Sequence, residues 1–522
     1  MVLIRILDFL FSVKVFEILI LSFFYYIFRF YFNYFTRENP LHGPFPLPII
    51  GNLHLIRGSS FEFAQKSRQQ YGDLFELWLP NRNIYLNNAN QIEKLTQPST
   101  KSSFFAQMKL TKIFRKYLKE FGFVFLNDDH ESWRYYRKIL EQSLLNQKYQ
   151  HALFDEVLEC FKELQVYWEE LGAERVIDIK EWSLRLFFDI MIRTTTGENF
   201  SIMTKYFNSL TTGPKINIAK EIYEMGEDID QLLKKQVNAF SYFQLVPEAL
   251  ARSIFWWKTK KYFQEKEKVQ SIYNEIVQKR KQENKNGDLS SRKTDILNIL
   301  LNTNSFTDNN ESIRLSDKEI CVFLFEIINS SIHTTTNTFG FTIENIERNP
   351  NAKKKLLEEL STVFGDDKNN ISYDKLSQLK YLEAIIYETR RVFPPIAIAR
   401  INNKEVDVVG RKWHASTQFR INVHAIHHDP SLWHDPHEYK PERFLDEQKS
   451  NITRNSNLTF GTGLRICPGR FQAINMMKSI ISLIYLNYQV ELVDSHLPIK
   501  SEHTFMPVCL GGKVYLKPRN TE

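Results

Sequence analysis

The amino-terminal 35 residues form apolar and aromatic runs interrupted by five charged residues, namely Arg5, Asp8, Lys14, Glu17 and Arg29. The longest uncharged run, Ile18 to Phe28, is shorter than the ~20 residues that a spanning helix needs. Long charged side chains can keep their heads in water while their stems stay buried. The pattern therefore predicts a retained membrane anchor over residues 1–36. An amphipathic or simply buried first helix is the alternative.

Prolines alternate with apolar residues directly after this segment, where Gly43 to Asn52 reads GPFPLPIIGN. Alternating prolines cannot continue a helix and favour a stiff, extended backbone. We expect residues 37–54 to be a proline-rich linker that spaces a globular body from the anchor. An ordinary loop is the alternative.

The body, residues 55–522, shows helical periodicity in most segments and no internal repeat. Strand-like pieces occur near Leu74–Leu86, Lys404–Ile421 and Thr504–Leu516. Polar stretches at Gln278–Thr294 and Asn302–Asn310 predict surface connections between helices. The fold class predicted is one large, mainly α domain with minor β structure.

Composition narrows the function classes. The net charge is only +7, and Lys and Arg are spread along the chain, so a nucleic-acid binder is not expected. The small basic excess suits an acidic protein partner or anionic lipid. Four cysteines without a CxxC pair exclude a disulfide framework and favour a reducing compartment. The 41 Phe residues favour an interior that accepts large apolar molecules.

One cysteine, Cys467, lies in the loop FGTGLRICPGR, just before an apolar helix predicted over Phe471 to Tyr488. Two glycines allow the backbone to turn tightly and approach a flat cofactor. The helix start, with its exposed N–H groups, stabilises a thiolate over a thiol. Pro468 removes only a donor that has no helical partner. A buried structural cysteine in a glycine turn is the alternative.

This loop resembles the haem-binding loop of the cytochrome P450 family, FxxGxRxCxG, and is matched at Phe460, Gly463, Arg465, Cys467 and Gly469. The resemblance, to the microsomal type of eukaryotes, implies haem b (iron protoporphyrin IX) with Cys467 as the ligand to the iron. Phe460 would cover the sulfur side, Gly463 would shape the loop, and Arg465 would pair with a haem propionate. The implied fold is a triangular helical prism with small β-sheets.

Two further motifs carry the same resemblance. Glu388 and Arg391 match the family's ExxR helix within Lys380–Phe393, and Arg443 belongs to a PERF segment. In the family these three charges form a buried network beside the haem. Buried charges are tolerated only when they satisfy one another, so the role implied is structural.

Four more residues occupy places where the family contacts the haem propionates: Trp133, Arg137, Arg400 and His427. Trp133 and Arg137 share one helical face at i and i+4, as in the family's WxxxR helix. Arg400 is a candidate for the second propionate. For His427, a loop histidine without a haem contact is the alternative.

The apolar helix predicted over Cys321 to Ile346 departs from the family pattern near its middle. By its position, Thr334 matches the threonine that hydrogen-bonds iron-bound oxygen. Ser331 replaces the usual glycine and His333 replaces the usual acid. We therefore expect Cys467, Thr334 and His333 to be the catalytic residues, with His333 relaying protons near neutral pH. Hydroxyls that merely bond their own helix backbone are the alternative.

The resemblance implies a single-pass protein of the endoplasmic reticulum membrane whose catalytic domain faces the cytosol. It would insert one oxygen atom of O2 into a hydrophobic small molecule, with electrons from NADPH through NADPH–cytochrome P450 reductase. Two functions remain open beside it: reductase-independent rearrangement of a hydroperoxide, and haem binding without catalysis. Substrate contacts are expected in Ser102–Phe125, in Ile396, Ala397 and Ile398, and in Phe505–Val508, while Trp256 and Trp257 are candidates for membrane contact.

Overall fold

The protein is described from a computed structural model. The residues it describes are 13–56, 60–79, 81–96, 104–106, 129–211, 270–286, 294–302, 307–308, 311–312, 315–365, 371–395, 398–445, 452, 455–503 and 507–519.

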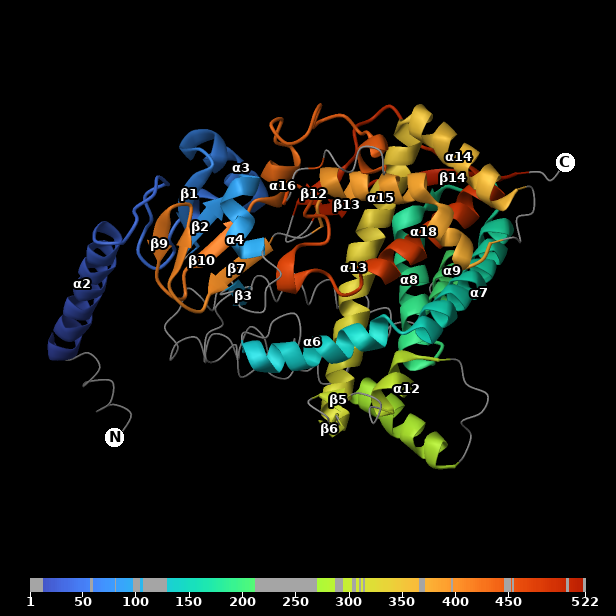
Figure 1. Cartoon of the computed structure of the whole chain (residues 1–522), viewed down its shortest axis with the longest axis horizontal. Coiled ribbons are helices and arrows are strands. Elements are labelled where there is room, and N and C mark those ends of the chain that lie inside the picture. Colours follow the sequence, from blue (N-terminus) through green and yellow to red (C-terminus); the bar gives the residue numbers. More distant parts are fainter. Residues whose placement is uncertain are drawn as a thin grey trace.

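A long amino-terminal helix, α2 (Val13–Phe35), projects from one end of the molecule (Figure 1). Its stretch Phe16–Phe35 is long and apolar enough to cross a membrane, with a mean hydropathy of 1.3 and no part of it buried. At its carboxyl end, Phe30 and Tyr34 pack edge-on against Trp78 of the body. The structure thus confirms that the apolar amino-terminal segment forms a helix. Anchoring in a membrane stays a proposal.

The proline-rich segment after α2 is held against the body along its length. The side chain of Asn52 donates to the carbonyls of Pro44 and Phe45 and accepts from the Trp78 N–H. Leu47 and Gly51 form a bridge that turns the chain back on itself. The segment is therefore a pinned connection that contains a turn, rather than an extended rod throughout.

Next to α2 lies a five-stranded sheet of order β1-β2-β10-β7-β3, in which β10 runs parallel to β2 and the other neighbours are antiparallel. Its strands are mostly buried because α3, α16 and the rest of the body cover them. The bounds are β1 (Leu74–Trp78), β2 (Arg82–Leu86), β3 (Phe104–Ala106), β7 (Ile398–Asn402), β10 (Gln418–Ile421), α3 (Ser60–Tyr71) and α16 (Val423–His427).

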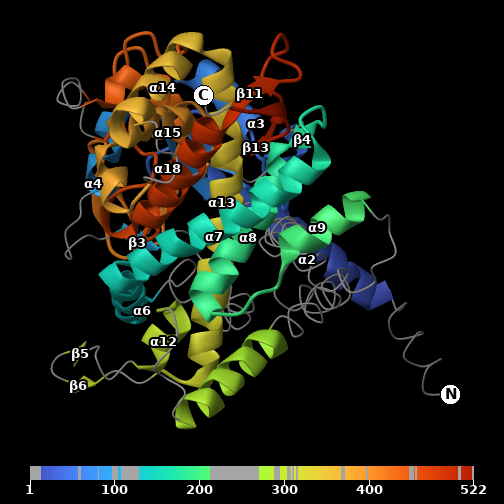
Figure 2. The same cartoon turned by 90° about the vertical axis from the view of Figure 1, so that its right-hand side faces the viewer.

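The remainder is a body of packed helices with small sheets at its margins (Figures 1 and 2). Its helices are α4 (Glu93–Thr96), α6 (His130–Leu144), α7 (Gln147–Leu171), α8 (Ile179–Thr196), α9 (Ile202–Thr211), α12 (Ile296–Leu301), α13 (Asp317–Arg348), α14 (Pro350–Phe364), α15 (Lys380–Val392) and α18 (Arg470–Asn487).

Short 3-10 turns and two- or three-stranded sheets complete the described chain. They are η1 (Leu53–Leu55), η2 (Ala89–Ile92), η4 (Asp374–Gln378), η5 (Pro441–Phe444) and η6 (Gly463–Arg465), the sheet of β11 (Tyr488–Leu492), β14 (Lys513–Pro518) and β4 (Ile177–Asp178), and the pairs β5 (Thr307–Asp308) with β6 (Glu311–Ser312), β8 (Val406–Val408) with β9 (Arg411–Trp413), and β12 (Ser501–His503) with β13 (Pro507–Cys509).

Helix α13 is the central element, and α8 packs along it (Figure 2). Its start is set by a capping box, in which Ser316 accepts from the Glu319 N–H and Glu319 bonds back to Ser316. Residues 335–346 are all buried. A helix that is apolar around most of its circumference belongs in a core, as its sequence predicted.

The mainly helical fold with small sheets is confirmed, and one local prediction is wrong. Residues 278–285, expected in a polar connection, lie in a helix that covers 270–285. The reason is that this helix buries Tyr273 and Val277, and its polar face includes Arg280, which is buried in an ion pair with Asp295 at 2.8 Å.

Candidate functional site

The cysteine loop is a tight turn that ends where α18 begins. The Cys467 N–H donates to the Phe460 carbonyl at 2.9 Å. Gly461 and Gly463 have φ of 74° and 66°, a left-handed conformation that side chains with a Cβ rarely adopt. Cys467 stays partly exposed, whereas Cys160, Cys321 and Cys509 are buried free thiols. Cys467 is thus the one described cysteine that is not fully buried.

Electrostatics around this sulfur act in opposite directions. Burial raises the pKa of the Cys467 thiol above its ordinary value, whereas the charge of Arg390, the Gly469 N–H and the charge of Arg137 all lower that pKa. An iron ion bound to the sulfur would stabilise the thiolate form against the effect of burial.

Several residues in the middle of α13 are more exposed than residues 335–346 of the same helix. Ser330 is exposed, and Ser331, His333 and Thr334 are partly exposed. The Thr334 hydroxyl donates to the Ser330 carbonyl at 2.8 Å, and the Ser331 hydroxyl donates to the Ile328 carbonyl at 2.9 Å. Both hydroxyls thus bond their own helix, as the alternative interpretation expected. Their partial exposure leaves them accessible to a small ligand.

Trp133, Arg137 and Arg465, each predicted to contact a haem propionate, come together beside the loop. The Arg465 guanidinium lies 4.3 Å from the centre of the Trp133 ring. Arg137 donates to the Ile466 carbonyl at 2.7 Å and pairs with Glu141. The buried Trp133 Nε1 has no hydrogen-bond acceptor among the described residues. A buried donor without an acceptor is costly, so this one suits the carboxylate of a bound group.

Arg400 also reaches the loop, because its guanidinium donates to the Thr462 carbonyl at 3.1 Å and to the Ala399 carbonyl at 2.8 Å. Burial lowers the pKa of Arg400 to about 10. The side chain therefore remains a cation at neutral pH and is available to a second carboxylate.

His427 differs from the other propionate candidates because both of its ring nitrogens bond to backbone groups of the protein. Its Nδ1 is 3.0 Å from the Arg391 carbonyl, and its Nε2 accepts from the Leu458 N–H at 2.9 Å. Burial lowers the pKa of His427 to about 3, so the ring is neutral and Nδ1 carries the proton. Because both ring nitrogens are engaged within the protein, this arrangement speaks for a structural link and against the propionate contact that the sequence suggested.

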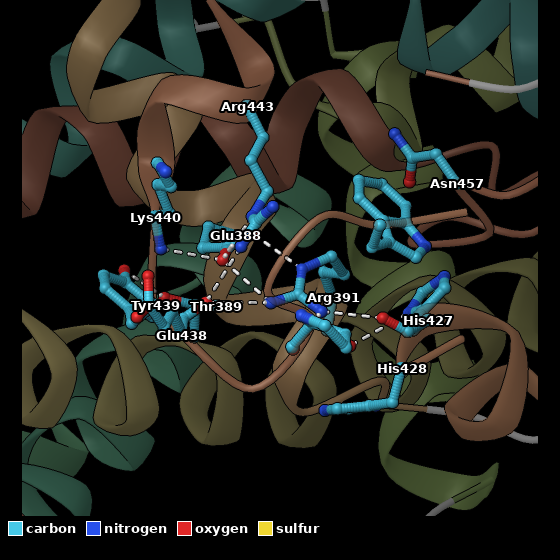
Figure 3. A network of polar contacts seen from close by, with 12 residues as sticks. Glu388, Thr389, Arg391, His427, His428, Glu438, Tyr439, Lys440, Arg443 and Asn457 are labelled. Atoms are coloured by element: carbon cyan, nitrogen blue, oxygen red, sulfur yellow. Dashed lines mark hydrogen bonds and ion pairs between the residues drawn. The ribbon is translucent and has the colours of Figure 1, made fainter. Parts of the chain in front are cut away.

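The ExxR network is formed as the motifs implied, and Figure 3 shows it from close by. Arg391 binds Glu388 through two contacts of 2.7 and 2.9 Å, and both side chains are fully buried. Arg443 reaches the same carboxylate at 3.4 Å. Arg391 also donates to the carbonyls of His427 and Pro436. The network ties α15 to η5 and to the segment that precedes the cysteine loop.

Sequence reasoning missed Arg390, the residue beside Arg391. Its guanidinium lies 3.9 Å from the centre of the Phe460 ring, and it donates to the Thr459 carbonyl at 2.7 Å. The only signal in the sequence was a second arginine inside the ExxR motif, one helical step from the first. The ExxR motif does not specify the residue at that position, so matching the motif gives no information about Arg390.

Several predicted substrate contacts lie outside the described residues. They are Ile396, Ala397, Phe505, Met506 and most of Ser102–Phe125. The predicted membrane contacts Trp256 and Trp257 also lie outside the described residues. Ile398 is described and is buried in β7. Pro507 and Val508 are partly exposed in β13.

The residues present fit a haem. Among the described residues, no group of three or more His, Cys, Asp or Glu side chains could hold a bare metal ion. A porphyrin supplies four nitrogen ligands itself, so the single sulfur of Cys467 suffices as the protein ligand. The buried Trp133 donor and the cations Arg137, Arg400 and Arg465 match the two carboxylates that haem carries.

Comparison with known proteins agrees with this geometry. The sequence model of the cytochrome P450 family matches residues 41–517, which include every site residue named above. Cytochrome P450 3A14 of Cavia porcellus is 25% identical over 495 residues, covering 94% of this chain and 91% of the relative. Tabersonine 16-hydroxylase 1 of Catharanthus roseus is 27% identical over 501 residues, covering 94% and 93%. Tabersonine 6,7-epoxidase isoform 1 of the same plant is 26% identical over 451 residues, covering 85% and 84%.

A match over nearly the whole body, together with the cysteine loop and the buried ExxR network, shows that the chain belongs to the cytochrome P450 family and is an oxidoreductase of the monooxygenase type.

Proposed function

We propose that the chain is a membrane-anchored haem-thiolate monooxygenase that inserts one oxygen atom of O2 into a hydrophobic small molecule. The observation that carries the proposal is that one side chain, Arg390, connects the segment leading into the Cys467 loop with helix α13. Arg390 spans the two, because it donates both to the Thr459 carbonyl and to the Thr338 hydroxyl, one helical turn beyond Thr334.

Haem b, held by Cys467, would supply the activation of O2 by two one-electron reductions, for which thiolate donation is suited. The protein residues have separate tasks. Trp133, Arg137, Arg400 and Arg465 would bind the two propionates and set the orientation of the ring. Thr334 would donate a hydrogen bond at the oxygen side, and His333 would deliver protons there. Phe460, which is 9% exposed, would keep water from the sulfur.

The substrate class follows from the side chains of the residues that are expected to contact the substrate. Ile398, in β7 beside Arg400, is apolar, and the other residues expected to contact substrate are mostly apolar. Two relatives are named as a hydroxylase and an epoxidase of tabersonine, which supports oxygen insertion as the reaction type. We propose a lipophilic substrate that reaches the site from the membrane side.

We propose NADPH–cytochrome P450 reductase as the electron donor and the endoplasmic reticulum as the location, with the body in the cytosol. Within the described residues one helix, at the amino terminus, is long and apolar enough to cross a membrane, which suits one membrane pass. The free cysteines suit a reducing compartment. A membrane flavoprotein reductase is then the donor that shares both the membrane and the cytosolic side.

One experiment tests the proposal against its competitors. The full chain is expressed with haem, its reduced carbon monoxide spectrum is recorded, and NADPH and O2 consumption are measured with purified reductase and a panel of lipophilic compounds. The expected result is a thiolate-type spectrum that Cys467→Ser abolishes, with turnover that requires reductase. A Ser330→Ala variant is the control, because that exposed hydroxyl bonds only its own helix.

The same experiment also tests the rearrangement of a hydroperoxide. This second function is considered because Ser331 and His333 replace the family's usual glycine and acid. Turnover of hydroperoxides alone, without reductase, would replace the monooxygenase proposal with that function. A thiolate spectrum without any turnover would favour haem binding alone. A chain that takes up no haem would overturn all three.

A further inference from the structure

Arg390 is a buried cation that contacts both sides of the candidate site. Its side chain is 6% exposed. Nη1 donates to the Thr338 hydroxyl of α13 at 3.2 Å, and Nη2 donates to the Thr459 carbonyl at 2.7 Å. The same guanidinium stacks over Phe460, whose carbonyl accepts the Cys467 N–H. One side chain therefore connects the central helix to the loop that holds the sulfur.

The charge of Arg390, unlike that of Arg391, is not neutralised by a carboxylate among the described residues. Arg391 is bound by the Glu388 carboxylate, whereas within the described part of the chain Arg390 forms no ion pair with a carboxylate. A buried cation without an anion is expensive. Ligation of iron by Cys467 would place an anion, the thiolate, on the loop that Arg390 contacts through Phe460.

Arg390 keeps its charge at neutral pH, because burial lowers its pKa only to about 10.

We propose that Arg390 is a positioning residue that raises the reduction potential of the haem iron, by placing an unneutralised cation beside the Phe460–Cys467 loop. The physical reason is that gaining an electron makes the haem–thiolate unit more negative, and a nearby cation in a dry environment stabilises the more negative state. The cation also withdraws electron density from the sulfur, which weakens its donation to iron. This inference rests on the proposed ligation by Cys467.

The test uses the full chain with haem bound and measures the midpoint potential by spectroelectrochemical titration and the iron–CO stretching frequency. Three variants separate charge from contact. Arg390→Met removes the charge, Arg390→Lys keeps it, and Thr338→Val removes only the bond to α13. Arg193→Met is the matched control, because it removes a cation of α8 that Glu163 of α7 already neutralises.

We expect Arg390→Met to shift the ferric–ferrous equilibrium toward ferric by about tenfold, which is ~59 mV for a one-electron couple. Arg390→Lys should recover most of this shift, and Thr338→Val and Arg193→Met should leave the potential near that of the parent. The iron–CO frequency should move with the potential, because both report electron donation by the sulfur. A purely structural Arg390 would move neither quantity.

Each remaining outcome decides the matter. An unshifted potential in an Arg390→Met variant that keeps its thiolate spectrum refutes the role of Arg390 alone. If Arg390→Met loses haem while Arg390→Lys retains haem and the parent potential, the charge requirement is supported. If both variants lose haem, Arg390 only holds the loop and the proposal fails. A parent protein without a thiolate spectrum refutes the site itself, which is a separate result.

Discussion

Single side chains around the cysteine loop owe their charge state to their contacts. His427 is neutral because burial outweighs the effect of the carbonyl that accepts from its Nδ1. Burial is also the main reason why the pKa of His428, the next residue, is lowered to about 4. Arg390 and Arg400 remain cations although burial lowers the pKa of each to about 10. The site therefore combines neutral rings for structure with cations that can face carboxylates or a thiolate.

His427 makes the fold sensitive to acid. The unfolded chain takes up a proton on this ring below a pH of about 6.5. The folded chain does so only near a pH of about 3. The unfolded state binds more protons between these values, so the free energy of unfolding falls as pH is lowered through that window. We measure stability by thermal unfolding between neutral pH and about pH 4. Over this range the stability of His427→Gln should fall less steeply with decreasing pH than that of the parent.

The control for this prediction is His434→Gln, since that side chain is 85% exposed. It should reproduce the parent's dependence on pH. A His427→Gln variant with the parent's slope would show that other groups cause the acid sensitivity.

His333 provides a second prediction at this scale. If it relays protons, His333→Ala should raise the ratio of hydrogen peroxide released to product formed, by roughly tenfold or more. Ser330→Ala, on the exposed face of the same helix, should leave that ratio unchanged. Coupling in His333→Ala equal to the parent's would remove the relay hypothesis and leave Thr334 as the remaining candidate.

Secondary-structure elements around the site are joined by buried charges. Glu388 of α15 binds Arg391 of the same helix and Arg443 of η5, and it also accepts from the Lys440 N–H. Arg391 donates onward to the carbonyls of His427 and Pro436. The network fixes the chain between α16 and η5, which leads into the cysteine loop (Figure 3).

Breaking this network should therefore unfold the site. Glu388→Gln leaves two buried guanidinium groups without their anion, and we expect a loss of ~3–5 kcal/mol in the free energy of unfolding. Urea unfolding with haem absorbance as the second signal measures it. Glu358→Gln, from an exposed 3.9 Å pair with Lys354, is the control and should cost less than ~1 kcal/mol. Equal stability in both variants would contradict the structural role.

The whole molecule joins a projecting helix to its body through one buried carboxylate. Glu76 of β1 is 2% exposed and binds Arg37 at 2.7 Å and Arg82 at 2.6 Å. It also accepts from the Leu41 N–H. Aromatic contacts of Phe30 and Tyr34 with Trp78 act at the same place. The angle between α2 and the sheet is thus set by contacts rather than by the prolines alone.

Removing the contacts of Glu76 should make the chain after α2 more accessible to a protease. In Glu76→Gln the cation of Arg37 loses its anion, so trypsin should cleave the full chain after Arg37 several times faster than in the parent. Glu62→Gln, at an exposed position of α3, should retain the parent's rate. Unchanged cleavage in Glu76→Gln would show that the remaining contacts, such as those of Phe30 and Tyr34 with Trp78, are enough to hold the helix.

Local chemistry determined a large part of this protein from sequence alone. The glycine turn before Cys467, the periodicity of α13 and α18, and the spacing of Glu388 and Arg391 follow from near neighbours, so their pattern predicted their structure. The same motifs, through a family resemblance, predicted Cys467 as the iron ligand and haem as the cofactor. Helix bounds deviated by only a few residues because caps such as Ser316 lie just outside the apolar run.

Tertiary structure alone decided which side chains are paired and which keep an unpaired charge or donor. His427 resembled a propionate contact in sequence, yet the Arg391 carbonyl and the Leu458 N–H, both distant in sequence, occupy its two nitrogens. Arg390 resembled a spare arginine, yet folding buries it against Phe460 and α13. The physical reason is that burial and hydrogen bonding depend on groups brought together by folding, and these decide charge, tautomer and role.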